Sequence, residues 1–476
     1  MVKEAHRIGL KVVMDLVVNH TSDQHEWFQD ALKGGPKKDW YVWRPKNDEG
    51  KEPNNWGAIF GGSCWEWVES LGEYYLHVFD VSQPDLNWEN AEVREAVWEV
   101  MRFWLDKGSD GFRMDVINCI SKATGFPDAP VTDLSSPYQY GLIYRFNGPH
   151  VAEYLNEMHS AVLSHYPEKF TVGEAPGVKS AKEGLPLIKD GLPLQMLFHF
   201  EHMYVDHQPG QTCFNYKPWK LTDLKDILGK FMEDNQALGG WDSLYLENHD
   251  QPRILGRYAN DTTHRDASAK MLAIFIATGR GTLFVYQGQE IGMANPSSWT
   301  FEELRDLEEI QHFEAVKARG GDLEDALKQI QRIGRDNART IMQWDSTTNS
   351  GFTTGTPWIK ANTDYKEWNV EAQLAKPDTS VLGFWKRLLL IRKEHKGLVH
   401  GKFEMLDYAN QSVYAYTRSD KTGTYLVVCS FSEKVVEWKT PVEKGTLLIG
   451  NYAPSENETG DVMYLQPFEG RLYIIR

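Results

Sequence analysis

Short apolar runs alternate with amphipathic helical segments along most of the chain, and this alternation allows only a few folds. Strands are predicted over residues 11–18, 111–118, 169–175, 192–200, 243–247 and 282–286. Helices are predicted over residues 1–9, 92–107, 151–164, 221–238 and 268–277. Strands that alternate with helices form parallel βα units. The expected fold class is therefore α/β, with a parallel sheet covered by helices.

Polar side chains follow several of the predicted strands. His20, Asp115, Glu174 and Asp250 all stand at or after the carboxyl end of a strand, which is where a TIM-type (β/α)8 barrel carries its active site. A closed barrel needs eight strands, and about six are found here. We therefore expect an N-terminally truncated barrel that lacks two βα units, or roughly 60 residues. A truncated product and a mis-assigned start are both compatible with this expectation.

The chain divides into a barrel with two insertions and a second domain. Residues 1–20 and 85–395 are expected to form the partial catalytic barrel. The polar and aromatic segment 21–84 is expected to be a small inserted domain, the B domain, after the strand that would be the barrel's third. Residues 295–375 are predicted to be an insertion over the barrel mouth, and residues 396–476, with short alternating runs, a C-terminal all-β domain.

Composition restricts the partners. The chain has 51 basic and 67 acidic residues, a net charge of −16, which argues against a nucleic acid or an anionic membrane as partner. Its 17 Trp, 21 Tyr and 21 Phe residues can supply flat apolar platforms for sugar rings. The four cysteines lack paired zinc spacing, and no signal peptide or transmembrane run is apparent. We expect a cytoplasmic protein with no metal, no cofactor and a neutral substrate.

The stretch 111–118 (GFRMDVIN) is predicted to be a strand that carries catalytic chemistry. On a strand, Arg113 and Asp115 project to one side and Phe112 and Met114 to the other. A guanidinium beside a carboxylate favours the ionised form, which suits a nucleophile or an electrostatic stabiliser. A structural ion pair at a strand end is the alternative interpretation.

Five motifs occur in one order along the predicted barrel. They are DLVVNH at 15–20, QPDLN at 83–87, GFRMD at 111–115, GE at 173–174 and NHD at 248–250. This set resembles the motifs of the α-amylase family of glycoside hydrolases, family 13. RDNART at 335–340 and MQW at 342–344 resemble its α-glucosidase branch, which contains oligo-1,6-glucosidase. In that family an N-terminal part supplies two more strands, a Tyr–Asp pair of the glucose pocket and, in some members, a metal loop.

The resemblance implies three catalytic carboxylates. Retaining glycosidases need an ionised carboxylate and a protonated carboxyl roughly 5 Å apart. Asp115, beside Arg113, would be the nucleophile. Glu174, at the end of a mainly apolar strand, would be the acid/base, with its pKa raised by desolvation. Asp250 would bind ring hydroxyls of the −1 sugar and favour the positively charged transition state.

The resemblance also implies a set of substrate-binding residues. His20 and His249 would donate hydrogen bonds to sugar hydroxyls, although a histidine at a strand end is often structural. Arg335 would close the far end of the glucose pocket and give exo action. Phe79, for which a core role is an equal alternative, and Gln83 would line that pocket. Asp15 is expected to have a structural, hydrogen-bonding role. The expected substrate-binding residues are His20, Phe79, Gln83, Arg113, His249 and Arg335.

Val116, the residue after the predicted nucleophile, indicates the linkage that is cleaved. A branched side chain there resembles the α-1,6-type pattern, whereas Val116 as an ordinary β-branched strand residue is the alternative. The resemblance therefore implies an exo-acting retaining α-glucosidase that acts on isomaltose-type oligosaccharides, with α-1,4-linked oligosaccharides as further candidate substrates. A monomer is expected. Two alternatives stay open: a sucrose isomerase or trehalose synthase type of rearrangement, and an inactive truncated fragment. A non-catalytic relative such as an amino-acid transporter heavy chain would be expected to have lost the carboxylates and to carry a membrane helix, and neither feature is apparent in the sequence.

Overall fold

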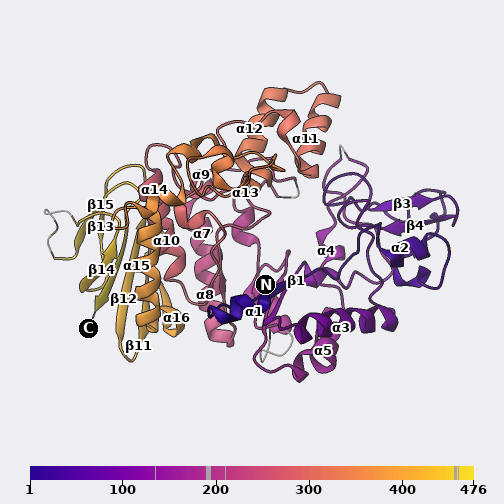
Figure 1. Cartoon of the computed structure of the whole chain (residues 1–476), viewed down its shortest axis with the longest axis horizontal. Coiled ribbons are helices and arrows are strands. Elements are labelled where there is room, and N and C mark those ends of the chain that lie inside the picture. The colour runs from indigo at the N-terminus through magenta and orange to yellow at the C-terminus, as the bar shows by residue number, and fades with distance from the viewer. Residues whose placement is uncertain (135, 189–193, 210, 455–457, 459, 476) are drawn as a thin grey trace. The chain divides into compact units, whose positions relative to one another are not determined.

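The chain folds into two compact units, which are described separately. The computed structural model in Figure 1 describes residues 1–134, 136–188, 194–209, 211–454, 458 and 460–475. The first unit comprises Met1–Tyr204, Pro209–Gln211 and Leu238–Gly240, and the second comprises Val205–Gln208, Thr212–Ala237 and Trp241–Arg476.

A four-stranded parallel sheet forms the centre of the first unit. Its strands are β1 (Val13–Leu16), β5 (Gly111–Met114), β6 (Phe170–Glu174) and β7 (Met196–Phe198), in the order β1-β5-β6-β7. The predicted strands at these positions are confirmed, although each is shorter than expected, and residues 192–193 of the fourth prediction lie outside the described residues. In the register, Asp15 stands beside Arg113 and Met114 beside Gly173.

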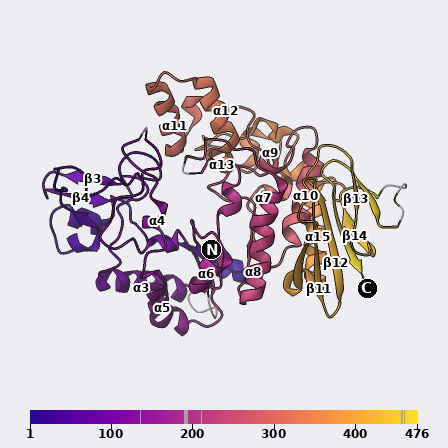
Figure 2. The ribbon, with the colours of Figure 1, turned by 180° about the vertical axis from the view of Figure 1, so that it is seen from behind.

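Helices cover one face of this sheet. They include α3 (Ala91–Asp106), α5 (Val151–Ala161) and α6 (Ala181–Ile188), whereas α1 (Val2–Arg7) has no buried residue. Figure 2 shows α3 and α5 side by side. Val97 of α3 and Leu155 of α5 belong to the same buried cluster as Phe112 and Met114, so the alternation along β5 directs Arg113 away from this core. Val100 of α3 is 39% exposed and lies outside this core.

The segment 21–84 is rich in aromatic packing. It contains α2 (Glu26–Ala31), β2 (Trp43–Arg44), β3 (Trp65–Val68) and β4 (Glu73–Leu76), with the three strands in the antiparallel order β2-β4-β3. The Phe28 ring of α2 contacts Tyr41, Trp43 and Tyr75 with centroid distances of 4.9, 6.1 and 5.0 Å. These rings fix α2 against the small sheet. That this segment is a separate inserted domain stays a prediction.

The second unit continues the strand–helix alternation. It contains α7 (Leu221–Leu224), α8 (Lys230–Leu238), β8 (Ser243–Leu244), α9 (Leu255–Tyr258), α10 (Arg265–Ala277) and β9 (Thr282–Leu283). Strands β8 and β9 pair in parallel, with Ser243 beside Thr282. A π-helical turn, Lys225–Gly229, interrupts the helix predicted over 221–238. The two strands are confirmed in position but end three residues earlier than predicted.

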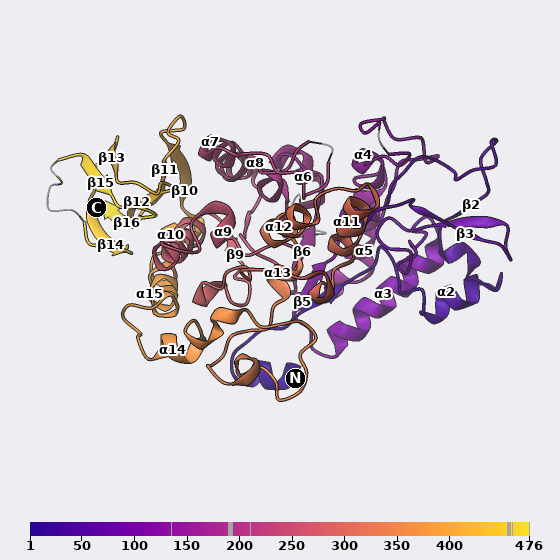
Figure 3. The same cartoon turned by 90° about the horizontal axis from the view of Figure 1, so that it is seen from above.

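Residues 295–375 consist of helices joined by long loops. They contain α11 (Leu307–Ala318), α12 (Leu323–Ile333), α13 (Asp336–Arg339) and α14 (Val370–Leu374), and Figure 3 shows α11 and α12 next to each other. Within the motif RDNART at 335–340, Asp336–Arg339 form the short helix α13. The buried side chains of Asp336, Asn337 and Ala338 hold this short helix in place.

The C-terminal part is all-β, as predicted, except that the short helix α16 (Gly397–His400) precedes its first strand. Its strands are β10 (Lys402–Leu406), β11 (Val413–Asp420), β12 (Gly423–Ser430), β13 (Val436–Lys439), β14 (Thr446–Gly450), β15 (Val462–Leu465) and β16 (Gly470–Ile475). They form an antiparallel sheet in the order β10-β11-β12-β16-β14 and a β13-β15 pair. Helices α10 and α15 (Val381–Glu394) lie beside this sheet in Figures 1 and 2, and their apolar side chains share one core with it.

The close approach of β5 and β6 gives a stability prediction. A Cβ added to Gly111, whose φ is +150°, would lie 1.8 Å from the carbonyl oxygen of Phe170. Gly111→Ala should therefore force the strands apart and destabilise the unit by about 1–3 kcal/mol, seen as a lower urea midpoint of unfolding. Gly355→Ala is the control, because the nearest atom to its added Cβ is 3.6 Å away. Equal midpoints for both variants would contradict this account of the sheet.

Candidate active site

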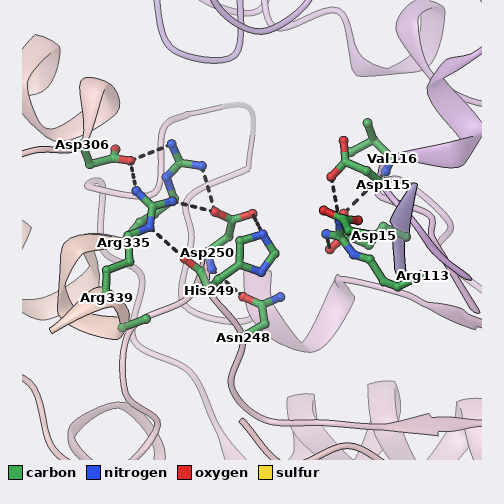
Figure 4. A network of polar contacts seen from close by, with 12 residues as sticks. Asp15, Arg113, Asp115, Val116, Asn248, His249, Asp250, Asp306, Arg335 and Arg339 are labelled. Atoms are coloured by element: carbon green, nitrogen blue, oxygen red, sulfur yellow. Dashed lines mark hydrogen bonds and ion pairs between the residues drawn. The ribbon is translucent and has the colours of Figure 1, made fainter. Parts of the chain in front are cut away.

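Arg113 lies among three carboxylates at the carboxyl ends of β1, β5 and β6. Its Nη1 donates to Asp15 Oδ1 at 2.6 Å and to Asp115 Oδ1 at 3.0 Å, and its Nη2 contacts Glu174 Oε1. Burial of the guanidinium lowers the pKa of Arg113, but the charges of Glu174, Asp115 and Asp15 outweigh it, and the pKa is raised. Figure 4 shows Arg113 with Asp15 and Asp115. The cluster thus brings together Asp115 and Glu174, the two residues predicted to be the nucleophile and the acid/base.

Glu174 is the last residue of β6 and is only 5% exposed. Its Oε2 also lies 3.5 Å from the backbone N–H of Val116. Sequence reasoning anticipated an apolar environment for this carboxyl but missed the Arg113 contact, which depends on the pairing of β5 with β6. A guanidinium contact favours the ionised carboxylate. The arrangement therefore differs from the expected one, in which desolvation alone acts on Glu174.

The chain leaves strand geometry directly after Asp115. β5 ends at Met114, and Val116 adopts φ 32° and ψ 45° before a 3₁₀ turn at Ile117–Cys119. The prediction of a strand through 118 is therefore wrong. A β-branched residue in the left-handed region is a genuine outlier, with a cost of about 1–3 kcal/mol. This turn directs the Val116 N–H toward Glu174 and so ties the residue after Asp115 to the second carboxyl.

His20, Gln83 and Phe79 form a second group in the first unit. His20 Nε2 lies 3.0 Å from Gln83 Nε2, and the His20 ring centroid lies 5.3 Å from that of Phe79. Burial lowers the pKa of His20, although the charges of Asp85 and Asp115 oppose it. The neutral imidazole is thereby favoured. The structure brings together three of the predicted substrate-binding residues.

A buried ion pair that the sequence analysis did not single out holds the His20 segment. Asp85 is 0% exposed, accepts hydrogen bonds from Asn19 Nδ2 and from the Val78 N–H, and pairs with Lys122 Nζ at 3.2 Å. Lys122 Nζ also donates to Asn19 Oδ1 at 2.9 Å. The signal available in the sequence was the position of Asp85 within the QPDLN motif.

Asp250, in the second unit, contacts two arginines and a histidine. Its Oδ1 accepts hydrogen bonds from Arg335 Nη1 at 3.1 Å and from Arg339 Nη2 at 2.8 Å, and its Oδ2 lies 3.2 Å from His249 Nε2. Burial raises the pKa of Asp250, but the charges of His249, Arg335 and Arg339 outweigh it, so the pKa is lowered. The structure therefore groups His249, Asp250 and Arg335, as predicted for one end of a sugar pocket.

Two further residues of this group were missed by the sequence analysis. Asp306 Oδ2 accepts hydrogen bonds from Arg335 Nη2 and Arg339 Nη1, both at 2.7 Å. Figure 4 shows the two arginines between the carboxylates of Asp250 and Asp306. Arg339 could have been found, because residues four apart lie on the same face of a helix. Asp306 precedes Arg335 by 29 positions, and no local pattern connects them.

The Arg113 group and the Asp250 group belong to different units and are described separately. In the part of the chain that the structure describes, no cluster of three or more His, Cys, Asp or Glu side chains is placed to hold a metal ion. Among those residues no helix combines the length and the apolar character needed to cross a bilayer.

Comparison with known proteins identifies the family. The model of the α-amylase catalytic domain matches residues 1–401. The oligo-1,6-glucosidase of Parageobacillus thermoglucosidasius is 46% identical over 100% of this chain and 85% of its own length, and that of Halalkalibacterium halodurans is 45% identical over 100% and 84%.

Solved structures agree with the sequence comparison. Trehalose-6-phosphate hydrolase of Bacillus licheniformis matches with a TM-score of 0.89 and 38% identity over 99% of this chain and 85% of that chain. A trehalulose synthase matches with a TM-score of 0.92 and 37% identity over 99% and 85%. The expectation of two absent βα units stays a prediction. The chain therefore belongs to the α-amylase family of glycoside hydrolases, family 13, with its TIM-type catalytic barrel and a C-terminal all-β domain.

Proposed function

We propose that this protein is an exo-acting retaining α-glucosidase that hydrolyses terminal α-1,6-linked glucose, with isomaltose-type oligosaccharides as substrates. One observation carries the proposal: a single guanidinium, that of Arg113, contacts Asp115, directly after β5, and Glu174, the last residue of the neighbouring strand β6. Two carboxylates that share one guanidinium are close neighbours, which suits the separation of roughly 5 Å in retaining enzymes rather than the wider spacing of inverting ones. The similarity to oligo-1,6-glucosidases supports the linkage.

The reaction follows from the two carboxyl groups. Asp115, kept ionised by Arg113, attacks the anomeric carbon, and the glycosidic oxygen leaves with a proton from Glu174. Water then attacks the glucosyl-enzyme ester, gives its proton to Glu174, and releases Asp115 and glucose with retained configuration. Glu174 must hold a proton at the first step, so its contact with Arg113 has to weaken when substrate binds.

The remaining residues are proposed to bind the terminal glucose. Asp250 would accept hydrogen bonds from its ring hydroxyls and stabilise the positive charge that develops in the transition state. His249 and His20 would donate to hydroxyls, and Phe79 and Gln83 would line the pocket. Arg335, fixed against Asp250 at 3.1 Å, would close the far end and confine cleavage to the chain terminus.

A glucosyl rearrangement is the second candidate, supported by the structural match to a trehalulose synthase. It would use the same covalent intermediate, with a sugar hydroxyl in place of water as the acceptor. The deciding experiment incubates the purified 476-residue chain with isomaltose, maltose and sucrose. Free glucose from isomaltose supports hydrolysis, whereas a rearranged disaccharide from sucrose without free glucose supports the second candidate. No product from any of the three sugars would contradict both.

The cellular compartment of the protein is inferred from its cysteine thiols. All four cysteines are free, and three of them are buried, which fits a reducing compartment. We therefore propose that the enzyme acts in the cytoplasm, as a monomer, on small oligosaccharides. Sedimentation of the purified protein at micromolar concentration tests the monomer, and a dimer mass would contradict it.

Val116 gives a prediction about linkage. Val116→Thr keeps a β-branched side chain in the same turn but adds a hydroxyl of the kind found in α-1,4-preferring relatives. The ratio of kcat/KM for maltose to that for isomaltose should rise about tenfold, the size of effect typical of one altered pocket contact. Hydrolysis of p-nitrophenyl α-glucoside, which has neither linkage, serves as the control and should change little. An unchanged ratio would remove Val116 from the specificity argument.

A further inference from the structure

The environment of Asp250 includes a second carboxylate that no motif predicted. Arg335 and Arg339 each use one nitrogen for Asp250 Oδ1 and another for Asp306 Oδ2, at distances between 2.7 and 3.1 Å. The four side chains thus form a closed ring of alternating charge (Figure 4). Both guanidiniums are held at two points, so neither can rotate without breaking a contact to Asp306.

Asp306 is itself held rigidly. It is the N-cap of α11, where its Oδ1 accepts a hydrogen bond from the Glu308 N–H at 3.0 Å. Its own backbone N–H donates to Asp336 Oδ2 at 3.1 Å, and the residue is 3% exposed. One carboxylate oxygen therefore caps the helix while the other receives both arginines. The cap gives the second oxygen a fixed position and direction.

The charge balance explains why a second carboxylate is needed. Two guanidiniums face the single negative charge of Asp250, and like charges brought together away from water repel strongly. Glu308 lies nearby, with its Oε2 4.0 Å from Arg335 Nε, but burial raises its pKa to about 7 even though Arg335 opposes this. Glu308 is thus only partly ionised near neutral pH. Asp306 has the direct contacts and supplies the second negative charge.

We propose that Asp306 is a positioning residue that fixes Arg335 and Arg339 on Asp250 and so preorganises the glucose-binding end of the site. The catalytic consequence rests on the proposed function, since Asp306 acts on the reaction only through the role of Asp250. The geometric consequence is that the positions of both guanidiniums depend on Asp306. This consequence holds whatever reaction the protein catalyses.

Asp306→Asn separates this role from helix capping. Asparagine is as good an N-cap as aspartate, so its Oδ1 can keep the Glu308 N–H while its amide nitrogen faces the two arginines, donor against donor. Misplaced contacts of this kind can cost up to about 10²-fold in rate. We expect kcat for isomaltose to fall by at least tenfold with a smaller change in KM, measured below the melting temperature, which the loss of two buried ion pairs should lower.

The matched control is Asp322→Asn. Asp322 caps the neighbouring helix α12 by accepting from the N–H groups of Glu324 and Asp325, and no arginine contact to it is described. This variant should retain wild-type kinetics. Asp306→Ser, which keeps a capping side chain without the carboxylate, is the second variant if the asparagine protein does not fold. The double variant Asp306→Asn/Arg339→Gln should be no slower than the slower single variant, because coupled residues are not additive.

Kinetics and crystal structures together decide the proposal. Loss of kcat in Asp306→Asn, with Arg335 or Arg339 displaced from Asp250 in its crystal structure, supports it. Kinetics within twofold of wild type, additive losses in the double variant, or arginines that stay in place would each overturn it. A wild-type protein that releases no glucose from isomaltose or maltose would instead refute the proposed function. In that case the positions of Arg335 and Arg339, compared between crystal structures of the wild type and of Asp306→Asn, still decide whether Asp306 fixes them.

Discussion

Asp115→Asn is expected to abolish the release of glucose from isomaltose. The amide has the size of the carboxylate but cannot form the glucosyl ester, so the covalent route is lost and kcat should fall by at least about 10³-fold. Arg113 would keep its contacts with Asp15 and Glu174, so the fold should be retained. The measurement is glucose released at substrate saturation, with circular dichroism to verify folding.

Asp15→Asn is the matched control for this experiment. Asp15 contacts the same nitrogen, Arg113 Nη1, at 2.6 Å, but its side chain is 57% exposed and precedes the end of its strand. Its loss should reduce kcat only modestly, since an exposed ion pair contributes about 0–1 kcal/mol. A slow fluorinated glucosyl substrate should also label the peptide that contains Asp115. Retained activity in Asp115→Asn, or a label on another carboxylate, would refute the nucleophile assignment.

The first unit shows how much of the site could be predicted from sequence. The two-residue period of β5 separates Phe112 and Met114 from Arg113, and the carboxyl ends of parallel strands meet at one edge. These rules are local, so they place Asp115 and Glu174 on the same edge without any knowledge of the register. They do not predict that Arg113 reaches Glu174, because that contact depends on which residues of β5 and β6 stand side by side.

Two other features lie outside what local rules can predict. Valine favours strands, so nothing in the sequence indicates the left-handed turn at Val116; the surrounding structure imposes it, as is common at functional sites. The ring around Asp250 joins residues of α11, α13 and the loop after β8 that are far apart in the chain. The four-residue spacing of Arg335 and Arg339 is the only part of it with a local signature.

Glu174→Gln is expected to give a loss that depends on the leaving group. Glutamine cannot donate the proton, so kcat for isomaltose, whose leaving group is a sugar alcohol, should fall by roughly 10²–10⁴-fold. A dinitrophenyl α-glucoside has a leaving group that departs without a proton, so formation of its glucosyl-enzyme should be affected much less. Glutamine also removes a negative charge beside Arg113, so the guanidinium then pairs with the carboxylates of Asp15 and Asp115 alone among these three residues.

Added azide tests whether Glu174 acts as the general base in the second step. Without a general base, water attacks the glucosyl-enzyme slowly, whereas azide is a nucleophile that needs no base. Azide should therefore accelerate Glu174→Gln on the dinitrophenyl substrate and yield α-glucosyl azide, the retained product. Glu153→Gln, at an exposed side chain of α5 that pairs with His150, should behave like wild type. Equal losses on both substrates, with no glucosyl azide formed, would show that Glu174 positions the substrate or Arg113 and does not transfer the proton.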